Sequence, residues 1–213
     1  EFDEPTAVIV KHNNPCGVAS STNLLTAFKV AMKTDLQSAF GGIISFNREV
    51  GASLAEEIVS SFKEGIIAPS YSEEALEIFS SKKNLRILEA GNLEDYHRSP
   101  SLRSLDGGWL LQEADEVCIS ISECKVVSKR KPTNEELEGL DFGWKVVKHV
   151  KSNAILFADK KRTVGIGAGQ MSRIDSVKIA TFKSIPNPKG TVMASDAFFP
   201  FRDGIDEAAK VGV

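Results

Sequence analysis

The sequence has few cysteines and histidines, and neither residue type is spaced as a metal site requires. Cys16, Cys118 and Cys124 form no CxxC pair, and their odd number argues against a disulfide framework. The three histidines show no HxE, HExxH or HxxxH spacing. Zinc chemistry therefore has no support in the sequence, and we expect reduced thiols and a protein that needs no metal.

The chain also lacks a long hydrophobic run and an excess of charge of one sign. No segment approaches the roughly 20 apolar residues of a membrane-spanning helix, and the acidic start at residues 1–4 is unlike a signal peptide. A formal net charge of -3 provides no basic field that would gather nucleic acid or an anionic membrane. We therefore expect a cytoplasmic protein with small-molecule or protein partners, and neither nucleic acid nor membrane among them.

The 213 residues are 42% hydrophobic and 26% charged, which is enough for one large or two small cores. Short apolar runs alternate with helical patterns, as is typical of α/β domains. Predicted strands cover residues 7–10, 43–46, 65–69, 85–88, 107–112, 154–158, 163–166 and 191–194. Predicted helices cover residues 23–33, 52–62, 70–81 and 133–151, with two more that begin near residues 172 and 204. Capping-box patterns at residues 70–73 and 133–136 mark two of these starts.

The chain divides into two halves. Residues 90–105 are rich in Gly, Asn, Ser, Pro and charge, and we interpret them as a connector. We place the boundary between a first subdomain, residues 1–125, and a second, residues 126–213. The second half repeats the order of the first in outline, so a duplicated architecture is a hypothesis. Both ends of the chain lie close to predicted elements, and we expect them to belong to a longer native protein.

The strand at residues 7–10 ends in Lys11, His12 and two asparagines, and residues 13–17 are suited to a bend. Because successive strand side chains point to opposite faces, Lys11 and His12 can face one pocket only if the backbone turns or bulges there. The imidazole could take a proton from a weak nucleophile while the ammonium stabilises a developing oxyanion, which suits acyl transfer. Alternatively, both are surface residues at a strand end.

Residues 163–173 (TVGIGAGQMSR) alternate glycine with small apolar residues before a helix start, and they resemble an anion-cradling turn. They match neither GxGxxG nor GxxxxGK[ST], and close packing of a strand on its neighbour is an equal explanation. The double glycine in residues 38–42 (SAFGG) would let backbone approach a ligand. Residues 151–153 (KSN) fall at the end of the predicted long helix, where a lysine and an asparagine cap are expected in any case.

Residues 195–204 (SDAFFPFRDG) place three aromatic side chains around a proline, with charges on both sides. This composition is poor for both strand and helix, and we interpret it as a rigid aromatic loop. Flat heterocycles bind between such rings, with charged groups fixing their orientation. The alternative is a hydrophobic cluster beneath a loop, and Asp203 could be the N-cap of the last helix.

Five segments, residues 11–17, 38–42, 150–154, 165–173 and 195–204, together resemble the transformylase domain of the bifunctional purine biosynthesis enzymes, in order and nearly end to end. The resemblance implies formyl transfer from the co-substrate 10-formyltetrahydrofolate to the 5-amino group of AICAR (5-aminoimidazole-4-carboxamide ribonucleotide). In the family this activity is joined to IMP cyclohydrolase. The implied fold is two tandem three-layer α/β subdomains like cytidine deaminase, without its zinc, and the implied assembly is a homodimer with shared active sites.

The same resemblance assigns the site. His12 matches the family's proton acceptor, and Lys11 matches the cation that stabilises the transition state. The residues expected to line the nucleotide site are Gly41, Glu64, Asn153 and Phe198. Those expected to meet the folate are Arg173, Ile174, Pro200 and Asp203.

Three departures from the family pattern bear on activity. The Arg-Tyr-Gly-x-Asn-Pro-His-Gln segment, the C-terminal Arg-His segment and the cyclohydrolase domain are not in this sequence. We therefore expect this chain alone to be weak or inactive in formyl transfer. The alternatives are a catalytically incomplete nucleotide-binding or dimerisation fragment, and a metal-free deaminase relative that would release ammonia.

Overall fold

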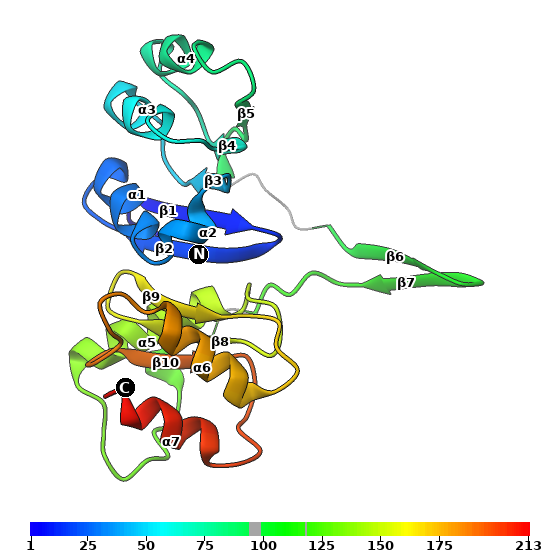
Figure 1. The fold of residues 1–213 in the computed structure, drawn as a ribbon. Coiled ribbons are helices and arrows are strands. Elements are labelled where there is room, and N and C mark those ends of the chain that lie inside the picture. The colour runs from blue at the N-terminus through cyan, green and yellow to red at the C-terminus, as the bar shows by residue number, and fades with distance from the viewer. Residues whose placement is uncertain (94–98, 118) are drawn as a thin grey trace.

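The computed structural model describes residues 1–93, 99–117 and 119–213. The strands in these residues form two sheets and one separate hairpin. The sheets lie one above the other, and the hairpin stands away from both (Figure 1). The chain is thus mixed α/β, as predicted. Cys118, whose thiol we expected to be reduced, lies outside the described residues.

The first half contains a five-stranded mixed sheet in the order β2-β1-β3-β4-β5. Its strands are β1 (Thr6–Lys11), β2 (Asn14–Ser20), β3 (Ile43–Phe46), β4 (Gly65–Ala68) and β5 (Arg86–Glu89). β1 pairs antiparallel with β2 and β3, whereas β3, β4 and β5 run parallel. Its helices are α1 (Leu24–Met32), α2 (Leu36–Ala39), α3 (Ala52–Val59) and α4 (Glu73–Ser80). The core between helices and sheet includes Ile9, Ile44, Ile58, Ile66 and Phe79, all fully buried.

The second half contains a three-stranded antiparallel sheet in the order β10-β8-β9. Its strands are β8 (Ile155–Ala158), β9 (Thr163–Gly167) and β10 (Val192–Ser195). Its helices are the short 3-10 helix η2 (Ile121–Glu123), α5 (Asn134–Val147), α6 (Arg173–Lys183) and α7 (Asp203–Lys210). Leu156 packs with Phe142 of α5, while Phe157 packs with Val177 of α6 and Ala208 of α7. Because neighbouring strand residues face opposite sides, the sheet lies between two helical layers.

The two halves meet where β2 lies beside β9. Val18 N donates a hydrogen bond to Thr163 Oγ1 at 2.9 Å, and Thr34 Oγ1 donates to Thr163 O at 2.8 Å. Val8 and Val18 belong to the hydrophobic core of the second half. Since these hydrogen bonds are buried and the two halves share a core, they are held together as one body.

The turn after β1 is tighter than the sequence suggested. The strand at residues 7–10 is confirmed, and the backbone turns at its end, but the bend does not extend over residues 13–17, because β2 begins at Asn14. Within those residues the register between β1 and β2 shifts where Ile9 faces Gly17 and Val10 faces Pro15. Only His12 and Asn13 form the turn, with φ of 52° and 62°, and Lys11 pairs with Asn14 across it. Asparagine tolerates this left-handed conformation, and Pro15 is tolerated because β2 is at the edge of its sheet.

The predicted connector contains a strand that the sequence analysis missed. β6 (Ser101–Leu105) pairs with β7 (Gly108–Gln112) across a two-residue turn at Asp106 and Gly107, where Gly107 has φ of 78°. Asp-Gly between two strands is a strong hairpin signal, because both central residues of such a turn need positive φ. The prediction failed because residues 101–105 were assigned to the connector and Gly107 to the strand that follows.

One of the two predicted capping boxes is present. Thr133 Oγ1 accepts a hydrogen bond from Glu136 N, and the Glu136 carboxylate accepts one from Thr133 N. The box at residues 70–73 is wrong, because the N-cap of α4 is Ser72, whose Oγ accepts from Ala75 N. The long helix ends at Val147 rather than near residue 151.

Two glycines of β9 show how closely this strand packs on α6. A Cβ atom added at Gly165 would lie 2.2 Å from Ala180 O, and one at Gly167 would lie 1.9 Å from Ser176 O. Both are backbone atoms of the helix. Close packing therefore accounts for these two glycines, and neither needs an anion to explain it.

Gly167→Ala is expected to lower the free energy of unfolding by about 1–3 kcal/mol, because the new methyl group must displace the α6 backbone. Urea unfolding followed by circular dichroism measures this change. Gly108→Ala is the control, since a Cβ there meets nothing within 4 Å. Equal stability of the two variants would contradict the packing argument.

Candidate functional site

The tip of the β1–β2 hairpin carries the two predicted catalytic residues. His12 is exposed in the turn, and Lys11 ends β1. Lys11 Nζ donates a hydrogen bond to Phe40 O, and a Cβ added at Gly41 would lie 3.4 Å from Lys11 Nζ. Gly41 has φ of 65°. The loop after α2 therefore meets the Lys11 ammonium where glycine permits both the turn and the close approach.

The same loop contacts the segment that contains Glu64. The Phe40 and Phe62 ring centroids are 5.6 Å apart, and Gly41 N donates to Phe62 O at 3.1 Å. Glu64 N donates to the carbonyl of the glycine after Gly41 at 3.2 Å, whereas the Glu64 carboxylate accepts a 2.7 Å bond from Arg86. Lys11, Gly41 and the Glu64 backbone thus form one group, with the Glu64 carboxylate paired to Arg86.

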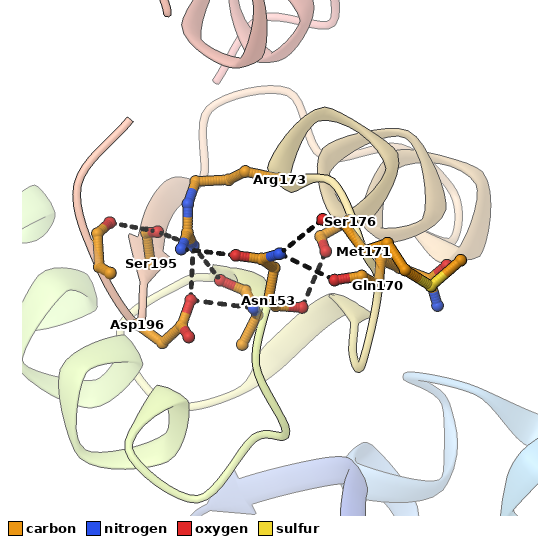
Figure 2. Close-up of polar contacts among 9 residues, drawn as sticks. Asn153, Gln170, Met171, Arg173, Ser176, Ser195 and Asp196 are labelled. Carbon is orange, nitrogen blue, oxygen red and sulfur yellow. Dashed lines mark hydrogen bonds and ion pairs between the residues drawn. The ribbon is translucent and has the colours of Figure 1, made fainter. Parts of the chain in front are cut away.

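Asn153 connects the start of β8 to the loop before α6 (Figure 2). Its Nδ2 donates to Gln170 O at 2.8 Å and to Met171 O at 3.1 Å. Arg173 Nη2 donates to Asn153 Oδ1 at 2.8 Å, and Ser176 Oγ donates to Asn153 O at 2.8 Å. Because α5 already ends at Val147, Asn153 is not a cap of that helix, and these four bonds fix its orientation instead.

The Arg173 side chain is largely buried and bonded to several neighbours. Its Nη1 donates to Ser195 Oγ at 2.8 Å and forms an ion pair with Asp196, and these side chains of Arg173 and Asp196 are only 9% and 17% exposed. The guanidinium carbon also lies 5.8 Å from the ring centroid of Phe199, a cation–π distance. Arg173 therefore connects the loop before α6 with the loop after β10.

Electrostatics keep Asp196 ionised. Burial acts to raise the pKa of Asp196, but hydrogen bonds from Arg173, Ser152 and Ala154 N outweigh it, so the pKa lies below its ordinary value. The Ala154 N–H donates to Asp196 Oδ1 at 2.9 Å. The pair is thus a charged, hydrogen-bonded junction beside Asn153.

A cleft of about 440 Å³ opens beside this junction. Its lining consists of Asn153, Met171, Ser172, Arg173, Ile174, Ala197, Phe198, Phe199, Pro200, Phe201 and Asp203. Six of the ten predicted site residues are among them, namely Asn153, Arg173, Ile174, Phe198, Pro200 and Asp203. Phe198 is 80% exposed at the cleft, so the 195–204 segment is not simply a packed hydrophobic cluster.

Asp203 is the first residue of α7, and the N-cap is Arg202, so the N-cap alternative for Asp203 is wrong.

One hydrogen bond links the hairpin tip that carries Lys11 and His12 to the segment that leads into the cleft. Lys151 N donates to Asn14 Oδ1 at 2.8 Å, which ties the hairpin tip to the segment leading to Asn153. Lys151 O in turn accepts from Gly169 N at 2.7 Å. The turn that carries His12 is therefore anchored to the same segment that enters the cleft.

Sequence reasoning missed two features of this site. It identified neither the Arg173–Asp196 pair nor the contact between Asn14 and Lys151, whose partners are 23 and 137 positions apart in the chain. A carboxylate in a largely apolar segment was the available signal for Asp196, because a buried charge needs a partner. No local signal exists for Asn14, since its partner is a backbone N–H of the other half.

Cys16 is unsuited to act as a thiolate nucleophile or as a metal ligand. Burial, and then the nearby Asp35 carboxylate, raise the pKa of the Cys16 thiol to about 11, so it stays protonated at neutral pH. Within residues 1–93, 99–117 and 119–213, no group of three or more His, Cys, Asp or Glu side chains could hold a metal ion. Over the same residues, no helix has the length and apolar character that a membrane crossing requires.

Fold and site together define a mixed α/β protein with an aromatic-lined cleft and with a hairpin tip, carrying Lys11 and His12, that Asn14 ties to Lys151, two residues before Asn153 of the cleft. A model of the AICARFT/IMPCHase bienzyme family matches residues 1–183, and the chain belongs to this family. The resemblance noted from its motifs is thereby confirmed, and it places the chain among bifunctional enzymes of purine biosynthesis. The match includes both predicted catalytic residues and ends before the aromatic loop of the cleft.

Proposed function

We propose that the chain transfers the formyl group of 10-formyltetrahydrofolate to the 5-amino group of AICAR, giving FAICAR and tetrahydrofolate. One observation carries the proposal: Asn14, the residue after the turn at His12 and Asn13, accepts a hydrogen bond from Lys151 N, two residues before Asn153 of the cleft. A base and a fixed cation beside an aromatic-lined space are what acyl transfer between two heterocycles needs.

In this mechanism the amine nitrogen attacks the formyl carbon, and His12 accepts the proton that the nitrogen releases. The formyl oxygen becomes an oxyanion, which the Lys11 ammonium stabilises. Collapse of this intermediate breaks the bond between the formyl carbon and N10 of the folate, and N10 takes up the proton that His12 accepted, which restores the neutral imidazole. Lys11 uses one N–H to hold Phe40 O, and an ammonium has three donors, so donors remain for the oxyanion.

The cleft residues divide by chemistry. Phe198, Ile174 and Pro200 supply apolar surface for flat rings, and Asp203 supplies a carboxylate at the rim. We assign Gly41, Glu64, Asn153 and Phe198 to the nucleotide, and Arg173, Ile174, Pro200 and Asp203 to the folate. Since the Arg173 guanidinium is already bonded to Asn153 and Asp196, we assign it a positioning role within that set.

We also propose that the two halves are tandem deaminase-like subdomains, divided near residue 125. The strand order β2-β1-β3 of the first half has its counterpart in β9-β8-β10 of the second. In each half a hairpin is followed by a helix, α1 or α6, whose backbone carbonyl lies against a strand glycine, Gly17 or Gly165. The shared strand order and the shared contact between a strand glycine and a helix carbonyl support a duplication, which the sequence alone only suggested.

The proposed assembly is a homodimer with shared active sites, located in the cytoplasm. Within the described part of the chain, the cleft is open and Phe198 and Phe201 remain largely exposed beside it. Exposed aromatic side chains at the rim of a site are suited to cover by a second subunit or by ligand.

A direct assay tests the function. The chain is incubated with AICAR and 10-formyltetrahydrofolate, and tetrahydrofolate and FAICAR are measured together with ammonia. We expect the two products in equal amounts, slowly formed but above a Lys11→Met control, because that variant loses the cation that stabilises the oxyanion. AICAR binding without turnover would favour the incomplete nucleotide-binding fragment, ammonia release would favour a deaminase relative, and absence of both binding and turnover would refute the proposal.

A further inference from the structure

Lys183, the last residue of α6, contacts the start of α2 in the other half of the chain. It forms an ion pair with Asp35, and its Nζ donates to Ser38 Oγ at 3.2 Å. The side chains of Asp35 and Lys183 are 12% and 36% exposed, so the pair is partly shielded from water. Burial acts to raise the pKa of Asp35, but hydrogen bonds from Lys183 and Ser38 outweigh it, so the pKa lies below its ordinary value. The two halves are therefore joined here by an ionised pair.

The same Asp35 carboxylate begins α2. Asp35 is the N-cap: its Oδ1 accepts from Ser38 N at 2.9 Å, and its backbone O accepts from Ala39 N at 2.9 Å. Its Oδ2, the oxygen paired with Lys183, also accepts from Ser38 Oγ at 2.7 Å. A helix of four residues is far too short to be stable by itself, so α2 depends on its cap and on the contacts around it.

The other end of α2 presents the carbonyl that holds Lys11. Phe40 is the C-cap of α2, and Phe40 O accepts from Lys11 Nζ. The chain then turns at once, because Gly42 N donates to Ala39 O at 3.2 Å, and a Cβ added at Gly42 would lie 3.1 Å from Ile9 Cγ2 in β1. The position of α2 therefore sets the position of Phe40 O, and with it that of the Lys11 ammonium.

α6 connects this loop with the cleft. Arg173 is the first of its 11 residues and Lys183 is the last, which separates them by about 16 Å of helix. Arg173 Nη2 donates to Asn153 Oδ1 at 2.8 Å beside the cleft, while Lys183 is bonded to Asp35. One helix thus contacts, through its two ends, both groups of predicted site residues.

We propose that Lys183 and Asp35 are positioning residues for Lys11: their ion pair holds α2 so that Phe40 O keeps the ammonium where it stabilises the oxyanion. The inference rests on the proposed formyl transfer and adds two residues to it, neither of which touches the substrates. A lysine has a long flexible side chain, so fixing its ammonium before the reaction removes an entropic cost from the transition state. A pair that served stability alone would have no particular effect on Lys11.

The reactivity of the Lys11 amine tests this directly and needs no substrate. Competitive labelling with acetic anhydride, read by mass spectrometry, measures how fast each lysine of the folded chain is acetylated. Lys183→Met and Asp35→Asn both remove the ion pair, and asparagine retains the N-cap. Each is expected to raise acetylation of Lys11 about threefold, because the hydrogen bond to Phe40 O is then held less firmly. Lys183→Arg keeps the cation and should restore the wild-type rate.

Lys178→Met is the matched control, because Lys178 lies on the same helix and pairs with Asp175 of that helix, both about half exposed. It should leave Lys11 labelling unchanged. Wild-type labelling of Lys11 in Lys183→Met would overturn the inference, and so would an equal rise at every lysine, which would show only a general loosening of the fold. Thermal unfolding checks that the variants stay folded.

Turnover in the full-length enzyme gives a second readout. Lys183→Met is expected to lower it about tenfold, with the KM for AICAR changed less than about twofold, because the pair acts on a group that works in the transition state. In a Lys11→Met background the same substitution should cost almost nothing further, and independent, multiplying losses would contradict the inference. Absence of formyl transfer in the wild-type enzyme would instead refute the proposed function, while the labelling would still decide whether the pair holds Lys11.

Discussion

Replacing His12 in the full-length enzyme is expected to reduce the turnover of formyl transfer by about 10²-fold or more, because general base catalysis contributes on that scale. The amine of AICAR is a weak nucleophile, and without a base its proton must leave to water. AICAR affinity should change little, since the exposed imidazole acts on the transferring proton rather than on ground-state binding. Tetrahydrofolate formation under saturating substrates measures turnover, and calorimetric titration measures affinity.

The choice of substitution matters because His12 lies in a left-handed turn with φ of 52°. Asparagine adopts this conformation more readily than alanine, so His12→Asn removes the base and preserves the hairpin. His149→Asn is the control, since the side chain of His149 is 47% exposed and its Nε2 lies 2.9 Å from Glu1 Oε2. Full turnover of His12→Asn would exclude His12 as the proton acceptor, and equal losses in both variants would point to a general effect.

Much of the fold follows from patterns that act over a few residues. The strands near residues 43, 65, 154, 163 and 191 and the capping box at Thr133 were predictable, because apolar runs and caps depend on neighbours in sequence. The errors at Asn14 and Ser101 have a common origin. Each strand adjoins a two-residue turn, and its residues beside that turn were assigned to a bend or to the connector.

The candidate site was predictable as residue types but not as geometry. Motifs identified Lys11, His12 and the aromatic loop, because these residues are unusual where they stand. No local pattern could show that Asn14 bonds Lys151, since that contact depends on how β2 and β9 pack. Nor could it show whether Gly165 cradles an anion or admits a helix, because both explanations require the same residue.

Removing one partner of the Arg173–Asp196 pair is expected to lower the free energy of unfolding by about 3 kcal/mol, because it leaves a largely buried charge without its counter-charge. Asp196→Ala also deprives Ala154 N of its acceptor, and Arg173→Met deprives Asn153 of a donor. Urea unfolding of each variant and of the double variant measures the loss. The double variant should lose clearly less than the sum, since neither charge then remains buried.

The pair between Arg202 and Asp206 provides the control, because its atoms are also within hydrogen-bond distance, at 2.8 Å, but its side chains are 87% and 45% exposed. Its substitution with methionine and alanine should leave the urea midpoint unchanged within error. The pKa of Asp196 is held below its ordinary value of 3.8, so the wild-type chain keeps this stabilisation above that pH and loses it as pH falls through the lowered pKa. Asp196→Ala should lack this part of the acid-induced loss. If the buried and exposed pairs proved equally dispensable, Arg173 would not be what holds Asn153 and the aromatic loop in place beside the cleft.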